Sequence, residues 1–393
     1  MKILQVVNYF SPAYAFGGPA KTAFQVSRKL VKGGHEVVVW TSDAKDRDSR
    51  LAVEPVKVVD GINVHYMRNL SMMTIKKSNL FITPELISKV KEEIKEFDII
   101  HLHGYRTFQN IVVQHYSKKY GVPYVLQARG SLPRIMAKQR LKWIYDVFFG
   151  YRLLRDASKV IALCRIEADQ YMDMGVQDEK IKIIPNGIEL SEYADLPPKG
   201  SFKEKFNIPK DTKIVLYLGR IHTIKGIDFL VKAYAHLIKK FKNILLVVVG
   251  PDDGYLDKLR WLISSLNIAD DVLLTGSLYG KDKLEAYVDA DIFVLPSRYE
   301  IFGNVVLESY ACSKPVVGTR VGGLQDIVFD GKTGLLVKPG DVKELYSAIF
   351  TLLNDDESRI SMGMQARKVV EEKFSIEKIV DKIEETYGEV IGR

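Results

Sequence analysis

The sequence predicts an α/β protein made of two doubly wound domains, each a parallel sheet with helices on both faces. Its 393 residues are too many for one ordinary hydrophobic core, so two domains are expected. Short apolar segments alternate with helix-like stretches in the first half, which is typical of parallel strands joined by helices. The same alternation begins again after residue 210, which indicates a second domain of the same class.

Five apolar segments in the first half read as buried strands, and a helix follows the first of them. Between Gly18 and Gly33 the residues Ala23, Val26 and Leu30 share one helical face, and Gly33-Gly34 ends the helix. The predicted strands are "ILQVV" (3–7), "EVVVW" (36–40), "DIIHLH" (98–103), "PYVLQ" (123–127) and "KVIALC" (159–164).

The second half has its own set of strands after a linker rich in proline and charge at 189–212. These strands are "KIVLYLG" (213–219), "ILLVVVG" (244–250), "DVLLTG" (271–276), "DIFVLPS" (291–297) and "PVVGT" (315–319). We expect domains at 1–188 and 189–374, followed by an amphipathic helix at 375–393 that opens on a serine N-cap. Ligands of such folds bind beyond the carboxyl ends of the strands, so two facing domains would place the active site in a central cleft.

Composition narrows the class of protein. Hydrophobic residues make up 47% and charged residues 27%, which fits a soluble globular protein, and no apolar run reaches the roughly 20 residues that span a bilayer. The first ten residues are too short and too strand-like for a signal peptide. Cys164 and Cys312 are far apart, which argues against a disulfide framework and for a reducing compartment. We therefore expect a cytoplasmic location.

Positive charge is concentrated in the first half of the chain. Residues 1–188 hold 29 Lys and Arg against 18 Asp and Glu, a net +11, whereas the whole chain carries +8. Such an imbalance predicts an anionic partner: nucleic acid, a phosphorylated substrate or a membrane surface. No nucleic-acid recognition motif accompanies the charge, so nucleic acid is not expected as a partner.

Two glutamates mark the loop and helix after the strand at 291–297, in "RYEIFGNVVLESYAC". Backbone N–H groups of Phe302, Gly303 and Asn304 would open that helix and present a positive dipole end to an anion such as phosphate. Glu300 would stand at its mouth and Glu308 on its first turns, where a carboxylate can accept hydrogen bonds from sugar hydroxyls. Taken alone, each glutamate would more simply be a surface charge.

Two cations follow the first strand of the second half, in "LYLGRIHTIKGIDF". Arg220 and Lys225 would lie at the carboxyl edge of the sheet, where guanidinium and ammonium groups suit a pyrophosphate. The competing interpretation is a pair of solvated loop cations. In a parallel sheet, however, this loop shares its edge with the Glu300 loop.

Weaker signals lie in the first half. Gly17-Gly18 occupies a long loop after the first strand, where backbone could approach a phosphate, although the spacing is not that of a dinucleotide fingerprint. His101 and His103 point to one side of a strand, and with no third ligand nearby we interpret His103 as a cleft residue and His101 as structural. "DRD" (46–48) reads as a solvated loop, so no metal site is predicted.

Taken in order, the motifs "GG" (17–18), "HLHG", "PNGI" (185–188), "GRIHTIKG" and "EIFGNVVLE" resemble the retaining glycosyltransferases of family 4 over nearly the whole chain. The resemblance implies the GT-B fold, with two Rossmann-like domains, an acceptor-binding first domain, a nucleotide-sugar-binding second domain and a last helix that packs back on the first. It implies a nucleotide diphosphate sugar as donor substrate, no cofactor, and no metal requirement.

The resemblance also assigns roles to residues. It implies that Arg220 and Lys225 hold the donor pyrophosphate, that Glu300 meets the transferred sugar, and that Glu308 holds the ribose. Further donor-side positions that it implies are Gly17, Gly18, Asn186, Gly250, Ser277, Leu278, Phe302, Gly303 and Asn304.

The chain departs from many family members after the strand at 123–127, where Arg129 replaces a histidine. Residues 129–155 hold seven Lys and Arg against one Asp, interleaved with aromatic side chains, a pattern that can bind an anionic membrane or a phosphate-bearing lipid. An ordinary core helix with solvated charges is the alternative. The acceptor-side candidates are therefore His103, Arg129, Arg134 and Lys138.

The sequence thus predicts a retaining glycosyltransferase that moves a sugar from a nucleotide diphosphate sugar to a hydroxyl of a glycan or lipid-linked acceptor. The acceptor is expected to be anionic or lipid-linked, and the protein to sit in the cytoplasm or peripherally on the inner face of the cell membrane. The alternatives are a sugar-nucleotide 2-epimerase of the same fold, which would need a different arrangement of acid/base groups, and a non-catalytic accessory subunit.

Overall fold

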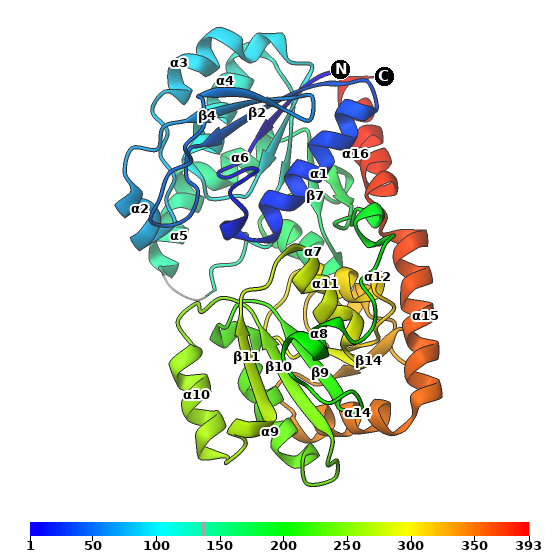
Figure 1. The fold of residues 1–393 in the computed structure, drawn as a ribbon. Coiled ribbons are helices and arrows are strands. Elements are labelled where there is room, and N and C mark those ends of the chain that lie inside the picture. Colours follow the sequence, from blue (N-terminus) through cyan, green and yellow to red (C-terminus); the bar gives the residue numbers. More distant parts are fainter. Residues whose placement is uncertain (136–137, 393) are drawn as a thin grey trace. The chain divides into compact units, whose positions relative to one another are not determined.

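The computed structural model describes residues 1–135 and 138–392, which form two compact units (Figure 1). The first unit consists of Met1–Gly187 together with Ile376–Arg393, and the second of Ile188–Ser375. The domain limits expected from the sequence, 188/189 and 374/375, lie one residue from these boundaries. Met136 and Ala137, which fall in the basic aromatic segment, lie outside the described residues, as does Arg393.

An eight-stranded sheet forms the centre of the first unit, in the order β3-β4-β2-β1-β5-β6-β7-β8. All neighbouring strands are parallel except β3 and β4. The strands are β1 (Lys2–Val6), β2 (Glu36–Ser42), β3 (Val56–Val59), β4 (Ile62–Met67), β5 (Ile99–His103), β6 (Tyr124–Gln127), β7 (Lys159–Ala162) and β8 (Ile181–Ile183). The helices are α1 (Gly18–Lys32), α2 (Met72–Ser78), α3 (Leu86–Glu93), α4 (Phe108–Tyr120), α5 (Gln139–Tyr145), α6 (Tyr151–Asp156), α7 (Arg165–Asp173) and α16 (Ile376–Ile391).

The strands predicted from apolar runs are the central ones, because they are buried on both faces and therefore contain few polar residues. The hairpin β3–β4 and the edge strand β8 were not predicted. Asp60 and Gly61, with φ of +51° and +80°, form a two-residue turn with the dihedral signs that hairpins favour. Strand β3 is mostly exposed, so its apolar pattern is weak and the Asp-Gly pair was the better signal.

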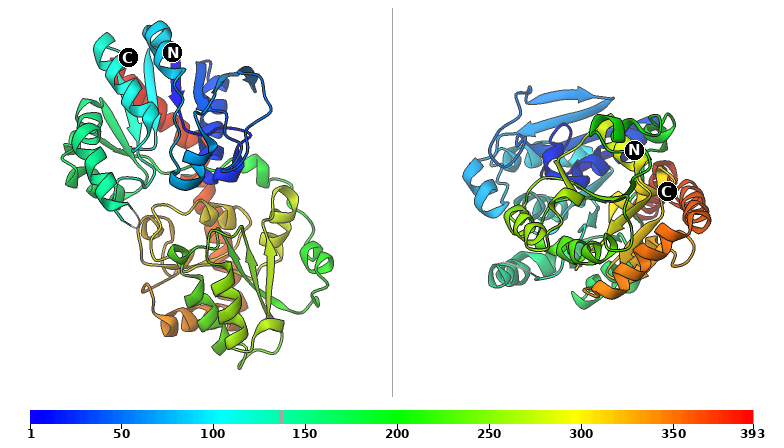
Figure 2. Two further views of the ribbon diagram at one scale, coloured as in Figure 1. Left: turned by 90° about the vertical axis from the view of Figure 1, so that its left-hand side faces the viewer. Right: turned by 60° about the horizontal axis from the view of Figure 1, so that its bottom comes forward.

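The last helix, α16, belongs to the first unit although it ends the chain. Its buried residues Ile376, Ile379, Val380 and Ile383 join the core beneath β1 and α1. In Figure 1 the red α16 lies beside the blue α1, and it stays within the first unit in the left view of Figure 2. An ion pair between Lys29 and Glu377 links the two helices at their surface. Sequence neighbourhood therefore does not decide which unit this helix stabilises.

The second unit holds a six-stranded, wholly parallel sheet in the order β11-β10-β9-β12-β13-β14. Its strands are β9 (Lys213–Leu218), β10 (Ile244–Val249), β11 (Val272–Gly276), β12 (Ile292–Leu295), β13 (Val316–Thr319) and β14 (Gly334–Val337). Its helices are α8 (Ser201–Lys205), α9 (Ile227–Leu237), α10 (Leu256–Ser265), α11 (Gly280–Asp289), α12 (Asn304–Ala311), α13 (Leu324–Ile327), α14 (Val342–Asn354) and α15 (Asp356–Lys373). Only β14 was absent from the predicted strands.

Among the described residues, no helix combines the length and the apolar composition that crossing a bilayer requires.

Candidate active site

Three of the predicted site loops follow strands that are neighbours in the second sheet. Arg220 follows β9, Gly250 follows β10 and Glu300 follows β12, and β9 lies between the other two strands. Because all three strands are parallel, the loops leave the same edge of the sheet. The structure thus brings together residues that are up to 80 positions apart in the chain.

Close backbone packing fixes these loops against one another. A Cβ atom added to Gly226 would lie 2.0 Å from the Pro296 carbonyl oxygen, and one added to Gly250 would lie 1.8 Å from the Gly219 oxygen. Both glycines also have positive φ, +64° and +150°. Glycine is therefore required at these two points because no side chain fits between the loops. The loops at this edge of the sheet are consequently packed tightly against one another.

The β12–α12 loop is further tied to the β9–α9 loop by Arg298. Its backbone N–H donates to the Ile224 oxygen at 2.8 Å, and its guanidinium makes two 2.8 Å bonds to the Asp228 carboxylate. A planar guanidinium that grips both oxygens holds its partner in one orientation. Sequence reasoning did not single out Arg298 or Asp228, because neither lies in a motif that points to chemistry.

Lys225 and Glu300 are in direct contact. The Lys225 ammonium donates to the Glu300 carboxylate at 2.5 Å, and their side chains are only 16% and 13% exposed. The sequence had given them separate partners, a pyrophosphate for the lysine and a sugar for the glutamate. In the structure the two charges balance each other at this edge of the sheet.

Arg220 pairs with Asp253, which follows β10. Its guanidinium donates to the Asp253 carboxylate at 2.5 Å, yet the Arg220 side chain remains 54% exposed. Tyr217 supports the loop from below by donating to the Arg220 carbonyl oxygen at 2.8 Å. Burial raises the pKa of Tyr217, and the nearby Glu300 carboxylate raises it further, so its hydroxyl keeps the proton that it donates. Asp253 was missed, although "GPDDG" directly follows a predicted strand.

Helix α12 begins where the sequence predicted a helix start. Gly303, with φ of +87°, precedes the first helical residue, Asn304. The Phe302 ring is buried and lies 6.3 Å from the Phe374 ring, so only the backbone of Phe302 can face a ligand. A helix of eight residues thus begins at the same edge as the Lys225–Glu300 pair.

Glu308 has two partners from α11, neither of which was predicted. Lys283 donates to one carboxylate oxygen at 2.8 Å and Tyr287 to the other at 3.1 Å. Burial and the Glu308 charge both raise the pKa of Tyr287, which keeps it a hydrogen-bond donor. Ser277 and Leu278 lie between β11 and α11, with Ser277 exposed and Leu278 half-buried. The i, i+4 spacing of Lys283 and Tyr287 places them on one face of α11 but does not link them to Glu308.

In the first unit, Gly17 and Gly18 join the long loop after β1 to helix α1. Gly17 has φ of +89°, and no atom lies within 4 Å of the position its Cβ would take. Gly18 is the first residue of α1. The loop itself is filled by aromatic packing, with Tyr9 stacked on Phe16 at 4.6 Å between ring centres.

A chain of hydrogen bonds runs beneath the carboxyl edge of the first sheet. Arg129 donates to His103 Nδ1 at 3.1 and 3.2 Å, and His103 Nε2 lies 2.6 Å from Gln5 Oε1. Gln5 Nε2 donates to the Tyr387 hydroxyl at 3.2 Å, which lies 2.6 Å from His101 Nδ1. Since Arg129 can only donate, His103 accepts on Nδ1 and carries its proton on Nε2, which donates to Gln5 Oε1.

His101 and His103, the two histidines in this chain of hydrogen bonds, are neutral at pH 7. Burial lowers the pKa of His101 to about 3, with Arg129 contributing, and it lowers the pKa of His103 well below the usual range, with His101 and Arg129 contributing. The rings stack with 4.1 Å between centres. His103 was expected to be a cleft residue; in the structure its ring is 3% exposed and both of its nitrogens are bonded.

Arg129 is the charged residue at one end of this chain of hydrogen bonds. It adopts φ of +53°, and its guanidinium also donates to Asn186 Oδ1 at 3.2 Å. Burial lowers its pKa to about 10, partly offset by the buried Glu167 carboxylate, so it remains a cation at neutral pH. Glu167 in turn accepts bonds from the backbone N–H groups of Gly130 and Leu163. The turn that carries Arg129 is therefore fixed from both sides.

Arg134 and Lys138, the other acceptor-side candidates, are engaged within the first unit. Arg134 donates to Asp146 at 2.7 Å and to the Tyr151 hydroxyl at 2.8 Å. Asp146 is completely buried and also binds Arg106. Lys138 is exposed and reaches the Lys77 carbonyl oxygen at 3.2 Å. The Arg134 side chain is nevertheless 32% exposed, so both side chains are accessible to an external partner, Lys138 more than Arg134.

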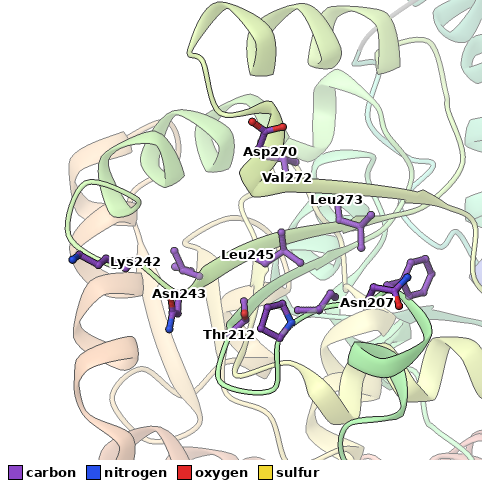
Figure 3. Close-up of a pocket in the computed structure, with 12 residues that line it drawn as sticks. Asn207, Thr212, Lys242, Asn243, Leu245, Asp270, Val272 and Leu273 are labelled. Carbon is purple, nitrogen blue, oxygen red and sulfur yellow. The ribbon is translucent and has the colours of Figure 1, made fainter.

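A groove of about 400 Å³ in the second unit lies away from these residues (Figure 3). Its lining includes Thr212, Asn243 and Val272, which lie at the amino ends of β9, β10 and β11. The predicted donor residues follow the carboxyl ends of the same sheet, so the groove is at the opposite edge. Within the described part of the chain, no group of three or more His, Cys, Asp or Glu side chains is placed to hold a metal ion.

Comparison with known proteins agrees with this arrangement. The family description Glycosyltransferase Family 4 matches residues 16–192, and Glycosyl transferases group 1 matches residues 198–369. A D-inositol 3-phosphate glycosyltransferase of Kineococcus radiotolerans is 26% identical, covering 90% of this chain and 86% of its own. An uncharacterised glycosyltransferase of Methanocaldococcus jannaschii is 27% identical over the full length of both chains.

Solved structures show the same fold. A sucrose-phosphate synthase of Thermosynechococcus elongatus has a TM-score of 0.83 at 23% identity and covers both chains completely. The Anabaena protein HepE, solved with UDP and glucose, has a TM-score of 0.80 at 21% identity, covering 99% of this chain and 100% of its own. Two Rossmann-like units of this kind constitute the GT-B fold. The chain belongs to the family 4 glycosyltransferases and is a glycosyltransferase enzyme.

Proposed function

We propose that the protein transfers a sugar, with retention of anomeric configuration, from a nucleotide diphosphate sugar to a hydroxyl of an anionic or lipid-linked glycan acceptor. The observation that carries the proposal is the meeting of Arg220, Lys225, Glu300 and the start of α12 at one edge of the second sheet. Two cations, a helix N-terminus and a carboxylate suit a sugar joined to a diphosphate.

The chemistry of this edge is electrostatic. When the glycosidic bond to the diphosphate breaks, negative charge grows on the leaving phosphate. Arg220, Lys225 and the N–H groups that open α12 stand at this edge before the donor binds, so they can stabilise that charge once the phosphate is in place. We assign Glu300 to the hydroxyls of the transferred sugar and Glu308 to the ribose. We assign no protein nucleophile, and the departing phosphate guides the acceptor to the same face.

The donor phosphate would compete for cations that already have partners. Lys225 would turn from Glu300 toward the phosphate, freeing the carboxylate for the sugar, and Arg220 would share its guanidinium between Asp253 and the phosphate. Likewise, Lys283 and Tyr287 hold Glu308 in position for the paired hydroxyls of a ribose. Donor binding would thus free Glu300 for the sugar, while Glu308 stays in place for the ribose.

Relatives support a nucleotide sugar donor and an anionic acceptor. HepE has been solved with UDP-glucose, and the names of several similar proteins specify inositol 3-phosphate or malate as the group that is glycosylated. Both of those acceptors are anions. The excess of positive charge in residues 1–188 supports an acceptor of the same sign for this chain.

Two other functions were considered. A 2-epimerase of the same fold would use acid and base groups on the sugar ring, whereas the edge described here presents a cation–carboxylate pair and a helix N-terminus that suits a phosphate. An accessory subunit would not need a complete donor set. We place the protein in the cytoplasm or at the inner face of the cell membrane, without cofactor or metal.

A donor screen tests the proposal. Purified protein is incubated with UDP-, GDP- and ADP-sugars and with phosphorylated or lipid-linked acceptors, and released nucleoside diphosphate is measured. We expect release of nucleoside diphosphate with one class of donor. Analysis of the product by NMR should show a linkage with the same anomeric configuration as the donor sugar. An epimerised donor formed without acceptor would establish the rival activity, and an inverted linkage would overturn retention.

A further inference from the structure

The surface formed by α5, the π-helical turn Asp146–Gly150 and α6 has its apolar side outward. We propose that this outward face docks the protein on an anionic lipid bilayer. The proposal rests on the proposed function, because it specifies where a lipid-linked acceptor would be met. The outward face consists of Leu141, Trp143, Ile144, Val147, Phe148, Phe149 and Tyr151, each between 41% and 62% exposed.

A helix on a water-soluble domain normally buries its apolar side and exposes its charges. Here the reverse holds. Asp146 is completely buried, where it accepts hydrogen bonds from Arg106 and Arg134. The Trp143 and Phe148 side chains on the other side are 53% and 62% exposed. Seven large apolar side chains on one exposed stretch form a larger patch than scattered surface hydrophobics explain.

The inward contacts prevent this segment from rotating to bury its aromatic side. Rotation would break the bonds of Asp146 to two guanidinium groups and leave a buried charge unpaired, which is strongly unfavourable. At Gly150 an added Cβ would lie 2.1 Å from the Tyr105 hydroxyl, so the backbone packs directly on that ring. The π-helical turn lies at this contact. The outward position of the aromatic residues is therefore built into the packing.

Charge identifies the partner as an anionic surface. Asp146 is the only acidic residue between 129 and 155, and it is buried, so the exposed charges of this segment are all positive. Lys138, Arg140 and Arg152 are exposed at its ends. Aromatic rings that enter the headgroup layer between cations are the pattern of interfacial helices on anionic membranes. A protein partner would have to match seven apolar side chains without any acid to fix its register.

Helix α2 lies beside one end of this segment and exposes further apolar side chains. Lys138 reaches the carbonyl oxygen of Lys77, at the end of α2, and Figure 1 shows α2 and α5 next to each other in the first unit. Around α2, Leu70 and Met73 are 65% and 62% exposed, and Lys77 is exposed too. Two apolar stretches with cations between them give a broader footprint than a single helix.

Vesicle flotation tests the proposal with a matched pair of variants. Arg140→Glu/Trp143→Ser removes one aromatic ring from the outward face and one exposed cation beside it. Arg260→Glu/Trp261→Ser makes the same changes on α10 of the second unit, where both side chains are exposed. On vesicles with about one-third anionic lipid at low salt, we expect the first variant to bind at least about tenfold more weakly than wild type and the second to bind as wild type.

Tryptophan emission gives a second readout. The chain has three tryptophans, and Trp40 is buried, so in a Trp261→Phe background only Trp143 is exposed to solvent. Anionic vesicles should shift its emission to the blue, and the shift should fade at high salt. Emission that is already blue in buffer would mean that another part of the chain, or a second copy, covers the face. That result would overturn the proposal.

Other outcomes separate this inference from the proposed function. Arg220→Ala should lose sugar transfer but still float, whereas Arg140→Glu/Trp143→Ser should still release nucleoside diphosphate with a water-soluble acceptor. Wild type that does not float on anionic vesicles, or a dimer in sedimentation that the outward-face variant abolishes, would contradict membrane docking. Flotation of a protein that uses no donor would refute the proposed function alone.

Discussion

Acidification should destabilise the first unit through its two buried histidines. His101 and His103 are neutral in the folded chain, because burial and the nearby Arg129 disfavour their protonation. In the unfolded chain each would have a pKa of about 6.5. Below that pH the unfolded state binds protons that the folded state does not, so stability falls as the pH falls. The loss begins near pH 6.5 and continues down toward the folded pKa, about 3 for His101.

The size of the stability loss follows from the difference in histidine pKa between the folded and unfolded states. From pH 6.5 to pH 5, His101 lowers the free energy of unfolding by about 2 kcal/mol, since one pKa unit corresponds to about 1.4 kcal/mol, and His103 acts in the same direction. His65, whose pKa burial also lowers, adds in the same direction. Glu167 acts in the opposite direction, because burial raises its pKa, so protonation favours the folded state. We therefore expect a net loss of about 2 to 4 kcal/mol between pH 7 and pH 5.

Urea unfolding followed by the fluorescence of the buried Trp40 reports on the first unit. Trp143→Phe and Trp261→Phe remove the other two tryptophans, leaving Trp40 in the core of the first sheet. With a denaturant slope of about 3 kcal/mol per molar, the midpoint should drop by about 1 M between pH 7 and pH 5. His101→Gln removes one of the two buried imidazoles and should show about half of that drop, with His103 responsible for the remainder. Equal midpoints at both pH values in wild type would refute the reasoning.

The other predictions concern the second unit. Arg220→Ala and Lys225→Ala should each lower kcat by ~10²–10³ while the thermal unfolding temperature stays near that of wild type, and near-normal turnover in both would exclude this phosphate site. Glu308→Gln should raise the KM for the donor more than it lowers kcat, because the ribose is remote from the breaking bond, whereas Glu300→Gln should mainly lower kcat. Steady-state kinetics with the two effects exchanged would contradict the assignment. Sugar transfer should persist in excess EDTA. If EDTA abolished the activity and added Mg²⁺ or Mn²⁺ restored it, the enzyme would require a metal ion and this prediction would be wrong.

Much of the fold could be predicted because the central strands are buried on both faces. Such strands must be almost wholly apolar, and β1, β5, β9 and β12 therefore stand out from their surroundings in the sequence. The exposed strand β3 gives no such signal and was missed. Motif spacing indicated Lys225, Glu300 and Glu308, because loops after parallel strands must meet at one edge.

Only the tertiary structure decided what those residues contact. The Lys225–Glu300 pair joins positions 75 apart, and Lys283 and Tyr287 reach Glu308 from a separate helix, so no local pattern could reveal them. The chain of bonds from Arg129 to His101 needs residues from β1, β5 and the last helix. The sequence by itself determined that residues 129–155 are basic and aromatic. Which side faces water depended on where Asp146 finds its arginine partners, and that is a property of packing alone.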